Sequence, residues 1–332
     1  MWYSFQRMRR LTAGLIVLLW LSSHTAAGQV PDGSGSGTLT FRSGVDLVTV
    51  SAVVRDQHGK VVTNLKRSDF YVVDGGAWRP IKEFRAEEAP VSVALLFDAS
   101  GSMQLASKLD RARAIARSFL WTLQAGRDEL AVYSFDTELH QVQPFEIYRQ
   151  DAAFERSLVG IKPYGMTSLN DAIAATARDV AARPNAHRAV IVFTDGLDNN
   201  SRLTPAQVSG IASSIDVPVY IVAVMSPLDR PGAATAVKTA HPVPVGNLAD
   251  LARWTGGRSF IASVPDESAA AVREMVAELR HQYLIAFEPG FRPGWHQLEV
   301  RTDDRRLQVR SRSGYFAGQA RQVTLTQDDR EH

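Results

Sequence analysis

The chain has 332 residues, 45% of them apolar and 22% charged, a composition typical of a soluble globular protein that is long enough for two domains. Lysine and arginine total 37 against 35 aspartates and glutamates, and this balance argues against binding to nucleic acid, which needs a strongly basic surface. The absence of cysteine excludes disulfides, thiol catalysis, Cys-based zinc sites and a lipid-modified cysteine.

Residues 1–28 have the layout of a secretory signal peptide, with a basic flank in "MWYSFQRMRR", an apolar core in "LTAGLIVLLWL" and small residues in "SSHTAAG". The apolar core is shorter than the roughly 20 residues that a membrane span requires. We therefore expect cleavage near Gln29 and a secreted, periplasmic or cell-surface protein that is not integral to the membrane; an uncleaved N-terminal anchor is the alternative. Residues 29–40 are rich in Gly and Ser and predict a flexible linker.

Residues 41–89 have a β pattern. "VDLVTVSAVVRD" is largely apolar and β-branched, and it ends at the turn "QHGK". "SDFYVVDGG" and "WRPIKEF" predict two more strands around a Gly-Gly turn. Three strands alone enclose a poor core, so this segment needs a packing partner.

Residues 90–264 alternate between apolar strands and amphipathic helices. "VSVALLF", "RAVIVFT" and "VPVYIVAV" are apolar on both faces, whereas "KLDRARAIARSFLWTL" and "DAIAATARDVAAR" have apolar residues at helical spacing. Strands buried on both faces indicate a mostly parallel sheet covered by helices on both sides. We predict a doubly wound α/β domain here, with Trp254 and Phe260 in its core.

Residues 265–281 predict a connecting helix. Over residues 282–318 the β pattern returns, with three strands in "YLIAFEP", "WHQLEVRT" and "RRLQVRSRSGYF". The economical arrangement pairs these strands with those of 41–89 in one β-sandwich, into which the α/β domain is inserted. Residues 319–332 form a tail.

Polar side chains follow the strands of the predicted α/β domain. Asp98, Ser100 and Ser102 come directly after "VSVALLF", and Asp195 follows "RAVIVFT". Thr167 stands just before the helix of "LNDAIAATARD". Because ligands of open α/β sheets bind beyond the carboxyl ends of the strands, we expect these two carboxylates and three hydroxyls to converge on one edge of the sheet.

These five side chains offer only oxygen ligands, without thiolate or imidazole. Oxygen ligation favours Mg²⁺, with Mn²⁺ or Ca²⁺ as alternatives, over zinc or copper. Two aspartates against a divalent cation leave a local charge near zero. An Asp or Glu side chain of a partner could then complete the metal shell without like-charge repulsion.

Each residue also has an ordinary structural interpretation. Asp98 could cap the turn that follows it, and Ser168 with Asp171 resembles a capping box at the start of a helix. Asp195 precedes a glycine, a common turn pair. The metal site is favoured because these ordinary interpretations would all have to coincide at one edge of the sheet.

A serine hydrolase is disfavoured. It would need a base beside Ser100 or Ser102 and usually a G-x-S-x-G elbow, whereas the local sequence is Ala-Ser-Gly-Ser and His140 lies in a polar stretch without an obvious acidic partner. We therefore expect no enzymatic activity. Asp198 and Asn199 are interpreted as turn residues at the rim of the site.

The stretch "FDASGSM", the threonine of "GMTSLNDAI" and the aspartate of "FTDGLDNN" resemble the metal-ion-dependent adhesion site of von Willebrand factor A-type domains. The resemblance spans about 91–264, and all five site positions match. It implies that Ser100, Ser102 and Thr167 contact the ion, with Asp98 and Asp195 bound directly or through water. The flanking β segments further resemble an exported bacterial subgroup described from acidobacteria.

Two functional hypotheses follow. In the first, the protein is an exported, divalent-metal-dependent binding module, in which an acidic side chain of a protein partner takes the open metal position. In the second, it is a structural or assembly scaffold of the cell envelope, and the metal only stabilises the fold. The sequence leaves the partner and the oligomeric state open.

Overall fold

The computed structural model describes residues 47–196, 198–225, 245–262 and 264–317. The predicted signal peptide, the linker, the first six residues of the predicted N-terminal β segment and the tail lie outside this range, as does most of the stretch between β9 and α5. In the described part of the chain, no helix combines the length and the apolar character needed to cross a membrane.

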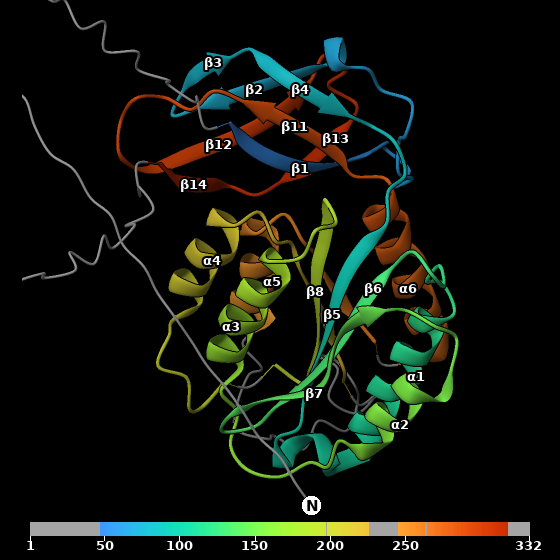
Figure 1. Ribbon diagram of the computed structural model, residues 1–332. Helices are drawn as coiled ribbons and strands as arrows, with labels where there is room; N and C mark the ends of the chain where they lie inside the picture. Colours follow the sequence, from blue (N-terminus) through green and yellow to red (C-terminus); the bar gives the residue numbers. More distant parts are fainter. Residues whose placement is uncertain (1–46, 197, 226–244, 263, 318–332) are drawn as a thin grey trace, which may run out of the picture. The chain divides into compact units, whose positions relative to one another are not determined.

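A six-stranded sheet forms the centre of the α/β region (Figure 1). Its strand order is β10-β9-β8-β5-β6-β7, and all strands run parallel except β7, which pairs antiparallel with β6. The strands are β5 (Val91–Asp98), β6 (Glu129–Phe135), β7 (Leu139–Ile147), β8 (His187–Thr194), β9 (Val219–Ala223) and β10 (Ser259–Ile261).

Helices cover both faces of this sheet, as the two-sided apolar strands predict. One face packs against α1 (Lys108–Leu120), α2 (Ala152–Gly160) and α6 (Pro265–Arg280). The other packs against α3 (Leu169–Ala181), α4 (Pro205–Ser214) and α5 (Val245–Trp254). The predicted fold class is confirmed; β7 and α2 were not expected from the sequence.

The flanking segments form two four-stranded antiparallel sheets around a common apolar core. One has the order β13-β1-β11-β4, and the other has the order β14-β12-β2-β3. The N-terminal strands are β1 (Val48–Arg55), β2 (Phe70–Asp74), β3 (Ala77–Arg79) and β4 (Ile81–Arg85). The C-terminal strands are β11 (Tyr283–Phe287), β12 (Gly294–Thr302), β13 (Gln308–Ser311) and β14 (Gly314–Ala317). Strands from both ends of the chain thus pair within each sheet.

The prediction of three strands at each end was wrong, because two of them are divided. "WRPIKEF" breaks at Pro80, which has no N–H for a ladder bond, and its halves β3 and β4 belong to different sheets. "RRLQVRSRSGYF" likewise divides into β13 and β14 at Arg312 and Ser313. At Gly314 a Cβ atom would lie 2.3 Å from the indole of Trp295, so only glycine lets this ring pack across the strand.

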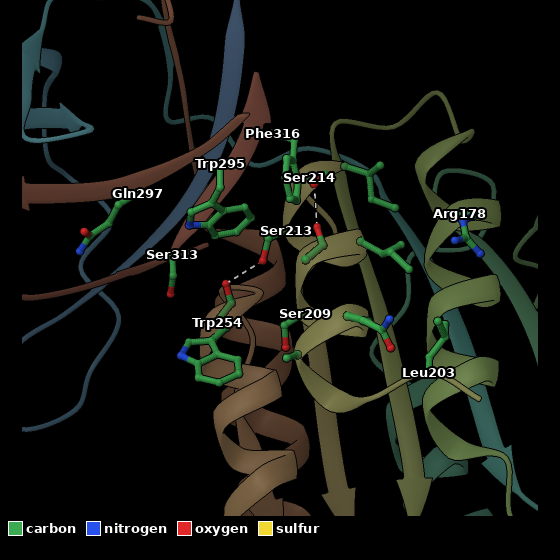
Figure 2. Close-up of a pocket in the computed structure, with 15 residues that line it drawn as sticks. Arg178, Leu203, Ser209, Ser213, Ser214, Trp254, Trp295, Gln297, Ser313 and Phe316 are labelled. Carbon is green, nitrogen blue, oxygen red and sulfur yellow. Dashed lines mark hydrogen bonds between the residues drawn. The ribbon is translucent and has the colours of Figure 1, made fainter. Parts of the chain in front are cut away.

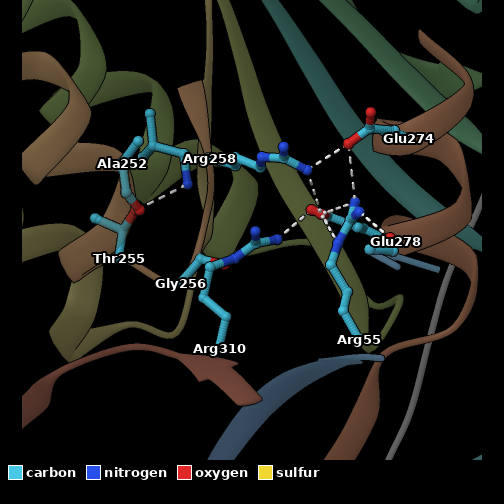
Figure 3. Close-up of polar contacts among 10 residues, drawn as sticks. Arg55, Ala252, Thr255, Gly256, Arg258, Glu274, Glu278 and Arg310 are labelled. Atoms are coloured by element: carbon cyan, nitrogen blue, oxygen red, sulfur yellow. Dashed lines mark hydrogen bonds and ion pairs between the residues drawn. The ribbon is translucent and has the colours of Figure 1, made fainter. Parts of the chain in front are cut away.

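A buried cluster of charges joins the sandwich to the α/β region (Figure 3). Glu278 of α6 has no exposed side-chain surface, and its Oε1 lies 2.5 Å from Nη2 of Arg55 in β1. Its other oxygen pairs with Arg310 of β13. Glu274, one turn earlier, pairs with Arg258 and lies 3.2 Å from Arg55. The cluster ties β1 and β13 of the sandwich to α6.

We predict that Glu278→Gln lowers the free energy of unfolding by about 3–5 kcal/mol, because the change leaves buried arginine charges without their counter-charge. Urea unfolding of wild type and variant measures the difference. The matched control is Glu299→Gln, since Glu299 forms an exposed pair with Arg301 and its loss should cost less than about 1 kcal/mol. A Glu278 variant as stable as the Glu299 control would contradict the prediction.

Candidate metal centre

The candidate site lies where the strand order of the central sheet reverses. From β5 the chain passes to β6 on one side, whereas β8, β9 and β10 lie on the other. Crevices at such switch points, beyond the carboxyl ends of the strands, are the usual ligand sites of open α/β sheets. Asp98 ends β5, and Asp195 directly follows β8, its neighbour in the sheet.

Asp98 is completely buried and accepts hydrogen bonds from the loop that follows it and from the neighbouring strand β8. The backbone N–H of Ser100 donates to Oδ1 at 2.9 Å, and the hydroxyl of Thr194 donates to Oδ2 at 2.6 Å. Burial raises the pKa of this carboxyl to about 6, against the opposing effect of these hydrogen bonds, and the nearby charge of Asp195 adds to the rise. A bound cation would favour the ionised form.

Two serine hydroxyls lie next to Asp98. Ser100 Oγ and Ser102 Oγ are 3.0 Å apart, at the start of the 3₁₀ turn Gly101–Ser107. Backbone hydrogen bonds tie this loop to the one that carries Thr167: Gly101 N–H donates to the Gly165 carbonyl at 3.2 Å, and Tyr164 N–H donates to Ala99 O at 2.6 Å. The structure thus brings the first two predicted loops together.

Thr167 is buried and fixed by the loop that follows β8. Its backbone N–H donates to Asn199 Oδ1 at 2.9 Å, and its carbonyl accepts from the N–H groups of Asn199 and Asn200 at 3.1 Å. Asp198 accepts a hydrogen bond from the N–H of Asn170, in the first turn of α3, at 2.9 Å. Asp198 and Asn199 therefore position Thr167, a role beyond that of the turn residues expected from the sequence.

Asp195 is buried, and its two oxygens differ. Oδ2 lies 3.0 Å from Nζ of Lys108, whereas Oδ1 is buried without a hydrogen-bond partner in the described structure. A buried carboxylate oxygen without a partner is costly, and a bound cation would satisfy it. Lys108 was not expected from the sequence, because it is the first residue of α1 and belongs to no site motif.

Of the two capping interpretations, the structure shows the turn at Asp98 but not the capping box at Ser168. Ser168 precedes α3 but makes no side-chain capping bond, and Asp171 instead accepts from the N–H groups of Arg202 and Leu203, so the capping box is absent. The turn bond from Ser100 to Asp98 does form. That bond uses Oδ1 alone and leaves the clustered hydroxyls and the orphaned Asp195 oxygen unexplained.

The side chains present fit a hard divalent cation. They offer carboxylate and hydroxyl oxygens, which suit Mg²⁺, Mn²⁺ or Ca²⁺, and one buried oxygen lacks a partner. Within the described ranges no group of three His, Asp or Glu side chains could hold a metal. A site built here depends on hydroxyls and on only two carboxylates.

Within the described part of the chain, neither Ser100 nor Ser102 has a histidine as a hydrogen-bond partner. The hydroxyl of Ser100 pairs instead with that of Ser102. His140 does have an acidic neighbour, contrary to expectation: its Nε2 lies 3.6 Å from Asp136. This pair contacts neither serine.

A cavity of about 1120 Å³ lies away from these residues, between α4 and strands β12 and β14 of the sandwich (Figure 2). Trp254, Trp295 and Phe316 line it and are each 38–48% exposed, so the expectation that Trp254 is a core residue was wrong. The carbonyl of Trp254 accepts hydrogen bonds from Ser213 and Ser313. None of the five predicted ligands lines this cavity.

Residues 93–197 match the model of the von Willebrand factor type A domain. This segment of the chain is therefore similar to a von Willebrand factor type A domain. The matched segment includes all five predicted site residues. No curated protein matches the chain.

Three solved structures illustrate the similarity. The hypothetical protein BatB of Bacteroides thetaiotaomicron is 19% identical, with 57% of this chain and 98% of that chain covered and a TM-score of 0.46. A von Willebrand factor type A protein of Catenulispora acidiphila is 17% identical, with coverages of 80% and 72% and a TM-score of 0.46. Proximal thread matrix protein 1 of the mussel byssus, described with a zinc-occupied MIDAS motif, is 14% identical, with coverages of 61% and 48% and a TM-score of 0.47. Similarities this distant do not indicate a function. The resemblance of the flanking β segments to an exported acidobacterial subgroup stays a prediction.

We predict that ionisation of Asp98 makes the metal-free protein less stable as the pH rises from about 4 to about 6. A folded-state pKa above the unfolded value means that the folded protein binds the extra proton in this window, so deprotonation costs stability, on the order of 3 kcal/mol. Urea unfolding in EDTA across this range measures it. Asp98→Asn should lack this loss, whereas the exposed control Asp110→Asn should retain it. Parallel pH profiles for wild type and Asp98→Asn would contradict the assignment.

Proposed function

We propose that this protein is an exported, divalent-metal-dependent protein-binding module. Asp98, Ser100, Ser102, Thr167 and Asp195 would hold the ion, Mg²⁺ in preference to Mn²⁺ or Ca²⁺. The bound ion would offer an open coordination position to a carboxylate oxygen of a partner protein. The observation that carries the proposal is the buried, partnerless Oδ1 of Asp195 beside the paired hydroxyls of Ser100 and Ser102.

Exposed apolar side chains on the site loops support a protein partner. Leu105, in the 3₁₀ turn after Ser102, is 66% exposed, and Tyr164 and Met166, just before Thr167, are 81% and 48% exposed. Apolar and aromatic groups around a polar centre are typical of protein interfaces. A site that only stabilised the fold would not require them, which favours the binding module over the scaffold.

The backbone beside Leu105 is strained. Ala106 and Ser107 have φ values of 51° and 55°, the left-handed region that residues with a Cβ rarely adopt. Such strain persists where the surrounding structure imposes it, and it is concentrated at functional sites. We attribute it to the sharp passage from the serine loop into α1.

We predict that wild-type protein binds Mg²⁺ saturably and that Asp98→Ala abolishes this binding, because the buried carboxylate would contact the ion directly or through water. Isothermal titration calorimetry with Mg²⁺, and separately with Mn²⁺ and Ca²⁺, measures both proteins. Asp110→Ala removes an exposed carboxylate of α1 and should bind as wild type does. Equal binding by wild type and Asp98→Ala would refute this metal site.

We also predict that peptides selected in Mg²⁺ from a random phage-displayed library and eluted with EDTA contain Asp or Glu beside apolar residues. Leu105→Ser and Tyr164→Ser should weaken binding of these peptides at least tenfold while Mg²⁺ affinity stays unchanged, because they alter only the rim. Trp78→Ser, at a 64% exposed tryptophan of the sandwich, is the control. Peptides without enriched acidic residues, or peptides that stay bound in EDTA, would favour the scaffold.

A further inference from the structure

Lys108 places a positive charge inside the candidate metal site. Its ammonium lies 3.0 Å from Oδ2 of Asp195, and the two side chains are only 14% and 4% exposed. Asp195 Oδ1, on the same carboxylate, is the buried oxygen without a partner. A cation bound to that oxygen would therefore be a close neighbour of the ammonium.

The local structure of α1 does not explain this placement. Lys108 is the first residue of the helix, where the helix dipole disfavours a positive charge. The chain reaches this position through the two strained residues Ala106 and Ser107. Both features cost free energy locally, and the contact with Asp195 offsets part of that cost.

A lysine in this position has opposite effects on the binding of the metal ion and on the binding of the partner's carboxylate. Its positive charge repels a divalent cation and so weakens metal binding on its own. The same charge attracts the carboxylate that would complete the metal shell. At separations of several ångströms in a partly buried site, such interactions are strong enough to change an affinity by a factor of ten or more.

We propose that Lys108 couples the two binding events, so that metal binds weakly alone and tightly together with a carboxylate. The inference rests on the proposed function and assigns a role to a residue outside the five predicted ligands. By linkage, the factor by which a carboxylate strengthens metal binding equals the factor by which metal strengthens carboxylate binding. Lys108 is a positioning and selectivity residue that favours anionic partners.

The test is calorimetric titration of Mg²⁺ into full-length wild-type, Lys108→Met and Lys108→Arg protein, each with and without saturating acetate as the carboxylate probe. We expect Lys108→Met to bind Mg²⁺ at least tenfold more tightly than wild type without acetate. The factor by which acetate strengthens Mg²⁺ binding should fall at least threefold in this variant. Lys108→Arg keeps the charge and should behave as wild type.

The melting temperature in EDTA gives a second readout. Lys108→Met should melt at a lower temperature than wild type, because Asp195 loses its counter-charge, and should gain more from added Mg²⁺. Lys82→Met removes a lysine of an exposed pair with Glu288 in the sandwich and controls for the loss of one positive charge. If Lys108→Met does not fold, Lys108→Gln provides the same comparison.

The outcomes separate this inference from the proposed function. If wild type binds Mg²⁺ and Lys108→Met binds it equally or more weakly, Lys108 only supports the structure of the site, and the inference is overturned while the metal site stands. If neither protein binds Mg²⁺ with or without acetate, the proposed function and the inference both fail. Tighter binding by Lys108→Met with reduced coupling to acetate supports the inference.

Discussion

The parallel pairing of β5 with β8 is the constraint on which the candidate site depends. The two strands are paired in register from Val91 with His187 to Phe97 with Phe193, so their carboxyl ends lie together. This register lets Thr194 reach Asp98 and places Asp195 next to it. Apolar side chains on both faces of the strands are buried under helices, and a shift of one residue would exchange these faces. The packing of the core thereby fixes the geometry of the polar residues beyond it.

Because of this constraint, the location of the site could be predicted from the sequence. A strand that is apolar on both faces indicates a parallel sheet, and polar residues directly after two such strands must then share an edge. Asp98 and Asp195 follow from this reasoning alone. Lys108, which this reasoning missed, follows a strained turn. Asn199 was expected only as a turn residue at the rim, yet its side chain fixes the backbone of Thr167 through a contact that has no periodic pattern. Such positions depend on how loops meet, which strand and helix periodicity does not encode.

The sandwich shows the same limit of prediction from periodic patterns, here for whole strands. Alternating patterns reveal that residues are β, but they do not reveal that a chain changes sheets within one extended run. "WRPIKEF" crosses between sheets at Pro80, and "RRLQVRSRSGYF" crosses after Ser311, where buried Arg312 bonds to carbonyls of Thr49 and Ser213. The exposure of Trp254 has a similar cause, since its surroundings come from α4 and the sandwich rather than from its own helix.

The position of the sandwich bears on where a ligand can approach the sheet. β4 of the sandwich is followed along the chain by β5 after a short connection, and the cluster around Glu278 joins β1 and β13 to α6 (Figures 1 and 3). The amino ends of the central strands therefore face the sandwich, and the carboxyl ends of β5 and β8 lie at the opposite end (Figure 1). Asp98 is the last residue of β5, and Asp195 directly follows β8. The loops that carry Ser102 and Thr167 also carry the exposed side chains of Leu105, Tyr164 and Met166. The proposed partner, a protein surface that presents one carboxylate among apolar side chains, suits such loops better than a small molecule, which requires an enclosing cavity.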